Sequence, residues 1–385
     1  MASVRKRSWH TTKGVEKTAW VVAYTHKGKQ HLKTFPTKRE ATAWRAEMQH
    51  EVKEGIHTPA TASITVAEAG KQWLIQAETD ELEASTLMQY RQHLEYHIAP
   101  FIGAVKLGEL TAADVQNFRN TLLTLRGDKR SQIMVKKVVT SLGAILANAM
   151  ADGKVARNVV REQTRLRGPR DKRREKRHDK SLKVGEDIPT KDEIRAMLDA
   201  AQTPWRPLIV TTVFTGLRAS ELRGLTWDDV DLAGATLRVR QRADRWNKIG
   251  NPKSGGSERE VPLAPMVVNT LKEWFLACPK GKMNLVFPDS DGNVNSLQNI
   301  RRQGLGPLQV AAGISTDKLH PKYGLHSLRH AAASLFIEQG FSPKRVQALM
   351  GHSTIGMTFD TYGHIFKSPD DDQEAMEQLQ ARLVG

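Results

Sequence analysis

The sequence predicts a multidomain α+β protein, in which a small N-terminal β-sheet with one helix precedes four helices and then a mainly helical domain with a small antiparallel sheet. Three observations support this class. The chain has 385 residues, too many for one ordinary hydrophobic core. Short apolar-rich runs flank a turn near the N-terminus, whereas later apolar residues recur at helical spacing. A basic segment without an apolar pattern then separates the second region from the third.

The first module, residues 1–60, is expected to combine strands with a helix. Residues 17–35 have the composition of a strand pair around the turn-prone segment Thr-His-Lys-Gly-Lys. A helix is predicted from Thr37, whose hydroxyl can cap it while Glu40 completes a T-x-x-E box, to Gly55. The module is therefore a compact sheet and helix rich in Lys and Arg.

Helical periodicity dominates the second module. Residues 64–152 carry apolar residues three and four apart and little that indicates a strand, which predicts a four-helix domain over 61–155. Lys and Arg then crowd together over 156–188, where the apolar pattern fails. This segment is predicted to be a basic linker, either a solvated tether or a strap across a polyanionic backbone.

The third module, 189–368, is predicted to be mainly helical with a small antiparallel sheet. It begins with a capping box from Thr190 to Glu193. The remaining expected elements are helices over 207–225, 326–339 and 343–350, and strands over 235–241 and 259–263 around a Gly/Ser-rich turn.

Charge and cysteine content limit the class of protein. Lys and Arg number 58 against 42 Asp and Glu, a formal net charge of +16 that suits a nucleic-acid partner better than an acidic protein or a small metabolite. The single cysteine, Cys278, cannot form an internal disulfide, which indicates a reducing, cytoplasmic environment. The sequence has neither a signal-peptide pattern nor an apolar run of 18 residues, so secretion and membrane insertion are not expected.

Arginine and histidine motifs in the third module suggest chemistry at a phosphate. Residues 215–222, Thr-Gly-Leu-Arg-Ala-Ser-Glu-Leu, place Arg218 shortly after a glycine, and residues 325–330, Leu-His-Ser-Leu-Arg-His, place His326 and Arg329 one helical turn apart. Two planar guanidiniums can clamp one phosphate. Breaking a phosphodiester without metal also requires a nucleophile and an acid for the leaving oxygen.

These stretches closely resemble the arginine boxes of the tyrosine recombinases, the phage integrase family. Leu-Met-Gly-His-Ser at 349–353 and Thr-Tyr-Gly-His at 361–364 resemble the Gly-His and nucleophile motifs of that family, in the same order. The resemblance is strong from about 190 to 366 and weaker before it. It implies a site-specific recombinase that cuts and rejoins double-stranded DNA through a 3′-phosphotyrosyl intermediate, with no metal, ATP or other cofactor, and that acts as a homotetramer.

The resemblance also assigns residues. Arg218 and Arg329 would hold the phosphate, His326 and His352 would donate further hydrogen bonds or move protons, and Tyr362 would be the nucleophile. A free phenol titrates near pH ~10, so Tyr362 would need neighbouring cations and a proton acceptor to attack at neutral pH.

Two supporting residues follow from spacing and resemblance. Glu221 lies three residues after Arg218, where its carboxylate can orient a guanidinium or a histidine. The family places a lysine general acid on a β-hairpin, and Lys253 in Pro-Lys-Ser-Gly-Gly matches it, with Lys248 on the same excursion as the alternative. His326 and His330 lie four apart, but no third ligand follows at metal-binding spacing, so no metal site is expected.

The earlier modules resemble DNA-binding domains of the same family. The four-helix module resembles the core-binding domain, and candidate phosphate contacts are Lys136 and Lys137 in it and Arg173 and Arg174 in the linker; a solvated helix face is the alternative for the lysines. Residues 1–60 resemble an arm-site-binding domain. A heterobivalent integrase of a bacterial or phage mobile element would follow, bridging core-type and arm-type sites with a DNA-bending protein and a directionality factor.

The tail, residues 369–385, is acidic at its start and then amphipathic, with Met376, Leu379 and Leu383 at i, i+3 and i+7. By the same resemblance, it would dock on a neighbouring protomer, and packing on its own protomer is the alternative. Two other functions share the chemistry or the fold: a type IB topoisomerase that relaxes supercoils, and a catalytically silent DNA-binding regulator.

Overall fold

The computed structural model describes residues 2–10, 12, 16–26, 28–53, 63–125, 130–166, 182–252, 258–362, 376 and 380–381. Its contacts form two units, Met1–His178 and Asp179–Gly385, each of which is considered by itself. Several residues singled out from the sequence lie outside the described residues: Gly55, Arg173, Arg174, Lys253, Gly363, His364, Leu379 and Leu383.

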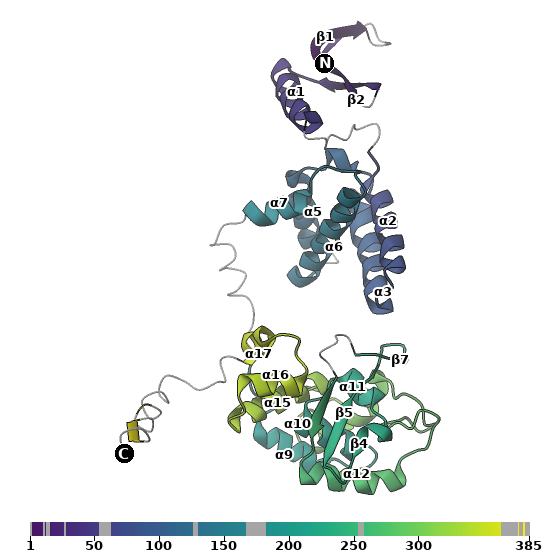
Figure 1. Cartoon of the computed structure of the whole chain (residues 1–385), viewed down its shortest axis with the longest axis vertical. Helices are drawn as coiled ribbons and strands as arrows, with labels where there is room; N and C mark the ends of the chain where they lie inside the picture. The colour runs from purple at the N-terminus through teal and green to yellow at the C-terminus, as the bar shows by residue number, and fades with distance from the viewer. Residues whose placement is uncertain are drawn as a thin grey trace. The chain divides into compact units, whose positions relative to one another are not determined.

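The N-terminal module is a three-stranded antiparallel sheet with one helix (Figure 1). Its elements are β1 (Ser3–His10), β2 (Glu16–His26), β3 (Lys29–Phe35) and α1 (Lys38–Lys53). Val22 and Tyr24 pack with Ala41 and Met48 of the helix to form a small core. The sequence predicted two strands rather than three, because the basic sequence of β1, SVRKRSWH, is more typical of a loop. This segment takes its strand conformation from pairing with β2.

The helical domain contains α2 (Val66–Thr79), α3 (Ala84–Gln92), a π-helical turn (His93–Ile98), α4 (Ala99–Ile102), α5 (Ala112–Thr124), α6 (Gln132–Ala151) and α7 (Val159–Leu166). Capping boxes begin α2 and α5, as expected where a threonine precedes an acidic residue by three positions. By length and composition alone α6 could cross a membrane, but one face of it, including Val138, Leu142 and Ile145, is buried in the core of this domain.

Helical packing extends beyond residue 155, where the sequence placed the start of a linker. Val159 and Val160 of α7 are buried in the core of the helical domain. Asn158 before them donates to the Gly143 carbonyl at 2.7 Å. The sequence of α7 is mostly polar after Val159 and Val160, so its apolar pattern did not reveal this helix.

The C-terminal unit is mainly helical around a small sheet, as predicted, and the α+β fold class is confirmed. Its helices are α9 (Lys191–Ala200), α10 (Trp205–Thr215), α11 (Ala219–Gly224), α12 (Pro265–Ala277), α13 (Leu297–Asn299), a π-helical turn (Ile300–Leu305), α14 (Gly306–Ala311), α15 (Leu325–Glu338), α16 (Pro343–Met350) and α17 (Ile355–Tyr362). The strands are β4 (Val230–Asp231), β5 (Thr236–Val239) and β8 (Arg259–Pro262) in the order β4-β5-β8, with a separate hairpin of β6 (Arg242–Ala243) and β7 (Ile249–Gly250).

One predicted helix is divided. Instead of a continuous helix over 207–225, α10 ends at Gly216, whose left-handed φ of +63° closes it, and α11 begins after Arg218. A side chain at Gly216 would also meet the Met350 sulfur, since its Cβ would lie 2.8 Å from that atom. The break turns the chain so that Arg218 stands at the start of a new helix.

Candidate active site

Arg218 is held by the residue that caps its helix. At the N-cap of α11, the Arg218 backbone N–H donates to Glu221 Oε2 at 2.8 Å, and its Nη1 donates to Oε1 at 2.7 Å. The carboxylate of Glu221 therefore satisfies an otherwise unpaired helix N–H and fixes the guanidinium with one side chain.

A second guanidinium, that of Arg259 at the start of β8, binds the same carboxylate. Its Nη1 and Nη2 lie 3.2 and 2.8 Å from Glu221 Oε1 and Oε2. Glu221 is 3% exposed. Burial alone would raise the pKa of this carboxyl, but Arg259 and Arg218 outweigh it and hold the pKa below its usual value. Glu221 is thus a buried anion between two cations.

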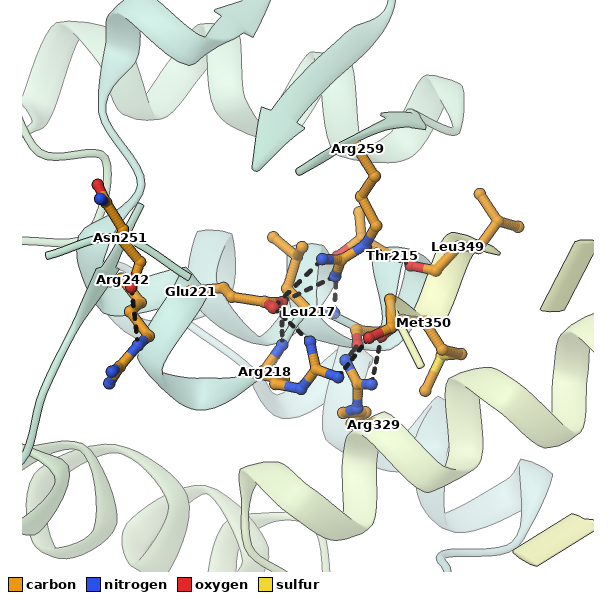
Figure 2. Close-up of polar contacts among 12 residues, drawn as sticks. Thr215, Leu217, Arg218, Glu221, Arg242, Asn251, Arg259, Arg329, Leu349 and Met350 are labelled. Atoms are coloured by element: carbon orange, nitrogen blue, oxygen red, sulfur yellow. Dashed lines mark hydrogen bonds and ion pairs between the residues drawn. The ribbon is translucent and has the colours of Figure 1, made fainter. Parts of the chain in front are cut away.

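Three arginines converge on the C-terminal end of α16 (Figure 2). They donate hydrogen bonds to three successive backbone carbonyls. Arg259 Nε donates to Leu349 (2.7 Å), Arg329 Nη2 donates to Met350, and Arg218 Nη2 donates to Gly351 (2.6 Å). Carbonyls at a helix C-terminus lack helical partners and carry partial negative charge, which favours cations there. The end of α16 therefore brings the two arginines of the separate sequence motifs, Arg218 and Arg329, to one place.

Gly351, the glycine of the Gly-His motif, permits this convergence. Its φ is +63°, and a Cβ there would lie 2.7 Å from Arg259 Nη1 and 3.2 Å from Arg218 Nη1. A side chain at this position would push against two guanidiniums and strain the backbone. The glycine is required both by its conformation and by the close approach of the arginines.

Arg329 on α15 is the most enclosed of the three. It is 4% exposed, and its Nη1 donates to the Gly216 carbonyl at 2.7 Å. Burial, with Arg218 nearby, lowers its pKa to about 9, which leaves it protonated at neutral pH. Arg218 and Arg329 therefore concentrate two positive charges at one site.

The two histidines expected at the site have different environments. His326 is exposed at the start of α15 and lines an open groove with Ala219, Arg301 and Leu325. His352 follows Gly351, and its Nδ1 lies 2.9 Å from the Thr358 hydroxyl. Partial loss of solvation by the surrounding protein, followed by the charge of Arg329, lowers the pKa of both, to about 4 for His352. At neutral pH, His352 is therefore uncharged.

Tyr362, the last residue of α17, is 1% exposed and packs against Ala333, Val346 and Met350. Its ring lies parallel to that of His352, with centroids 6.4 Å apart and an interplanar angle of 11°. Burial raises the pKa of its phenol above the usual value, and Arg329 counteracts this only in part. In this arrangement the phenol keeps its proton.

The structure describes three more of the residues predicted from the sequence. Lys248 lies exposed in the β6–β7 turn, where its backbone N–H donates to Asp244 Oδ1. Lys136 and Lys137 are exposed on α6 in the other unit.

Sequence reasoning missed Arg259 and His330. Arg259 had a detectable signal, because it alternates with the buried Val261 and Leu263 and so shares their inward face of the strand.

Two family models match the chain. A model described as the phage integrase family matches residues 189–368, and one described as the N-terminal SAM-like domain of phage integrases matches residues 65–123. The chain belongs to the phage integrase family of tyrosine recombinases. As a member, the protein is a site-specific recombinase.

Individual relatives of this recombinase match over most of its length. An integrase of Streptomyces ambofaciens is 29% identical over 342 residues, covering 85% of this chain and 82% of the relative. A XerC-like tyrosine recombinase of Caldanaerobacter subterraneus subsp. tengcongensis is 24% identical over 372 residues, covering 89% of each. The solved structure of the Tn1549 transposon integrase in complex with a circular intermediate DNA has a TM-score of 0.65 at 20% identity and covers 82% of this chain and 100% of that one.

Proposed function

We propose that this recombinase integrates or excises a mobile element by breaking DNA strands with Tyr362. The phenol oxygen attacks a phosphodiester, which forms a 3′-phosphotyrosyl bond and releases a 5′ hydroxyl. Attack by a 5′ hydroxyl from another strand then reverses the reaction and restores the DNA. Because the phosphotyrosyl bond conserves the energy of the original bond, rejoining needs no ATP.

One observation carries this proposal: Arg218 and Arg329 donate to neighbouring carbonyls at the end of α16, and Tyr362 packs against Met350 of the same helix. A guanidinium has five N–H groups, and these contacts leave donors on each arginine for a phosphate. Fixed cations stabilise the charge that builds on the non-bridging oxygens in the transition state, and they act without metal.

The remaining site residues support this step. His326 and His352 carry ring N–H groups that can donate to the phosphate, and Glu221 orients Arg218. The 5′ oxygen needs a proton as it leaves, which we assign to Lys253, with Lys248 as the alternative.

The sheet of residues 1–60 supports a second DNA contact, with arm-type sites. Val4 packs in the module's core, so the alternating Arg5, Arg7 and Trp9 of β1 lie on the opposite, uncovered face. A two- or three-stranded sheet can enter a major groove, where basic side chains read guanine. We propose that this face binds arm sites, with DNA-bending and directionality factors as partners.

Core sites would be bound by the helical domain together with the catalytic unit, in a homotetramer assembled on the DNA in the bacterial cytoplasm. Lys136 and Lys137 on α6, and Arg173 and Arg174 after it, are the proposed phosphate contacts in this complex. The tail would join neighbouring protomers.

A nicked suicide duplex carrying the core site tests the function, because loss of the short fragment beyond the nick traps the covalent intermediate. We expect a protein–DNA adduct on a denaturing gel, absent in Tyr362→Phe, which should bind the duplex with near-normal affinity. If the protein were a catalytically silent regulator, neither it nor the Tyr362→Phe variant would form an adduct. If it were a topoisomerase, it would relax plasmids that contain no paired sites.

A further inference from the structure

The hydroxyl of Tyr362 has a specific partner, the side chain of His330 on α15. The phenol oxygen lies 2.5 Å from His330 Nδ1, with ring centroids 5.6 Å apart. His330 directly follows Arg329 and lies one turn after His326. The residue expected to attack is therefore hydrogen-bonded to an imidazole that the family resemblance left without a role.

His330 is surrounded mainly by groups that disfavour its protonation. The ring centroid of His326, on the same helix, lies 4.3 Å away. Arg329 and His352 also lower the pKa of His330 electrostatically, whereas Asp187, before α9, raises it. Burial, followed by His326 and Arg329, lowers the pKa of His330 to about 4. At neutral pH the ring is therefore uncharged, and one of its nitrogens has a lone pair that can accept a hydrogen bond.

The other two histidines are less well placed to receive the phenol proton. His352 Nδ1 is paired with the Thr358 hydroxyl, and the parallel rings of His352 and Tyr362 have their centroids 6.4 Å apart. His326 is exposed at the groove. In the described part of the catalytic unit, His330 is the imidazole with a nitrogen at hydrogen-bond distance from the Tyr362 oxygen.

We propose that His330 is the general base of strand cleavage. The inference rests on the proposed function, in which Tyr362 is the nucleophile. In the tautomer with its proton on Nε2, His330 accepts the hydrogen bond from the phenol through Nδ1. As the phenol O–H bond breaks, its proton passes to Nδ1, and the oxygen forms the new bond to phosphorus.

The balance of the step requires a second proton carrier. The bond from phosphorus to the 5′ oxygen breaks, and that oxygen takes a proton from the general acid, while His330 is left as imidazolium. In rejoining, the attacking 5′ hydroxyl gives its proton back to the general acid as its oxygen bonds to phosphorus. His330 returns its own proton to the phenol oxygen as that oxygen leaves phosphorus. One histidine thus serves both half-reactions.

Two substitutions separate proton transfer from positioning. In His330→Asn, the short amide keeps a hydrogen-bonding group close to the position of Nδ1 but cannot take up a proton, and His330→Phe removes both properties. His320→Asn is the matched control, because His320 is an exposed histidine paired with Asp317. Thermal unfolding and core-site affinity of each full-length variant show whether the fold and DNA binding are preserved.

Single-turnover cleavage of the suicide duplex should fall by about 10²- to 10⁴-fold in both His330 variants, with core-site affinity within a few-fold of the parent and the control unchanged. A substrate with sulfur in place of the leaving 5′ oxygen needs no acid and should not rescue them. Fluorotyrosine has a more acidic phenol than tyrosine. Replacing Tyr362 with it should raise the cleavage rate of His330→Asn by a larger factor than it raises the rate of the parent.

The outcomes distinguish this inference from the function on which it rests. If the parent forms an adduct through Tyr362 and His330→Asn cleaves at the parental rate, His330 positions the hydroxyl without accepting its proton. Faster cleavage by His330→Phe would mean that the hydrogen bond restrains Tyr362, and would also overturn the proposal. Rescue by the sulfur substrate would make His330 an acid. If the parent itself forms no Tyr362 adduct, the proposed function fails.

Discussion

Removal of the Arg259 guanidinium should destabilise the catalytic unit through Glu221. In Arg259→Met, the buried carboxylate keeps Arg218 but loses two hydrogen bonds, and the Leu349 carbonyl loses its donor. Breaking a buried ion pair by removing one partner typically costs about 3–5 kcal/mol. Because Arg218 remains, we expect the lower end of this range, about 3 kcal/mol. The side chain of Arg259 is only 7% exposed, so solvent screening reduces this energy little.

Scanning calorimetry of the full-length protein measures this cost. For a unit of about 200 residues, 1 kcal/mol shifts Tm by roughly 2–4 °C, so a decrease of roughly 6–12 °C is expected in the transition of the catalytic unit. Arg238→Met is the matched control, because the Arg238–Glu260 pair on the same sheet is exposed and should contribute at most about 1 kcal/mol. Arg259→Lys keeps the charge but lacks the planar guanidinium, so its decrease in Tm should lie between those of Arg259→Met and the control.

Two further readouts connect the loss to the carboxylate. The pKa of Glu221 in the folded protein is depressed, so its contribution to stability is present above the unfolded pKa and is lost as pH falls through the folded value. Without Arg259 the folded pKa rises, and destabilisation by acid should begin at higher pH. Adding Glu221→Gln to Arg259→Met should recover part of the stability. A Tm shift below about 2 °C, or no recovery in the double variant, would refute the reasoning.

Three other predictions concern the reaction and the modules. Arg218→Ala and Arg329→Ala should each slow suicide-substrate cleavage at least about a hundredfold, since one lost charged donor costs roughly 3–4 kcal/mol, and EDTA should change nothing; inhibition by EDTA would contradict a metal-free mechanism. Deleting residues 1–60 should preserve core-site cleavage and abolish arm-dependent recombination, and unchanged recombination on full attachment DNA would count against an arm-binding module. Deleting residues 371–385 should weaken tetramer assembly in gel shifts while single-site binding stays intact, whereas normal assembly would argue against docking between protomers.

The sequence predicted elements wherever local pattern and tertiary packing agree. Apolar residues at helical spacing predicted the face of α6 that is buried, and the Thr190 capping box predicted the start of α9. The strand pairing of Leu237 with Val261 likewise lies within the two predicted strands. In each case, the same residues determine the local conformation and the contact with the core.

The features that the sequence did not predict depend on contacts with distant residues. Strand β1 has three consecutive basic residues at its centre and pairs with β2, so its conformation comes from a neighbour rather than from its own residues. The division between α10 and α11 needed the packing of Met350 against Gly216, which lies far away in the sequence. His330 and Arg259 contact residues 32 and 38 positions away. The alternation along the strand indicates that Arg259 faces inward, but no local spacing identifies the partner of either residue.

The central claim, a covalent bond between DNA and Tyr362, is tested most directly by mapping the attachment site. The trapped adduct would be digested with nuclease and protease, and mass spectrometry would locate the residue that carries the nucleotide remnant. We predict a single modified peptide with the 3′-phosphate on Tyr362. Modification of any other residue, or an adduct of undiminished yield from Tyr362→Phe, would contradict the account.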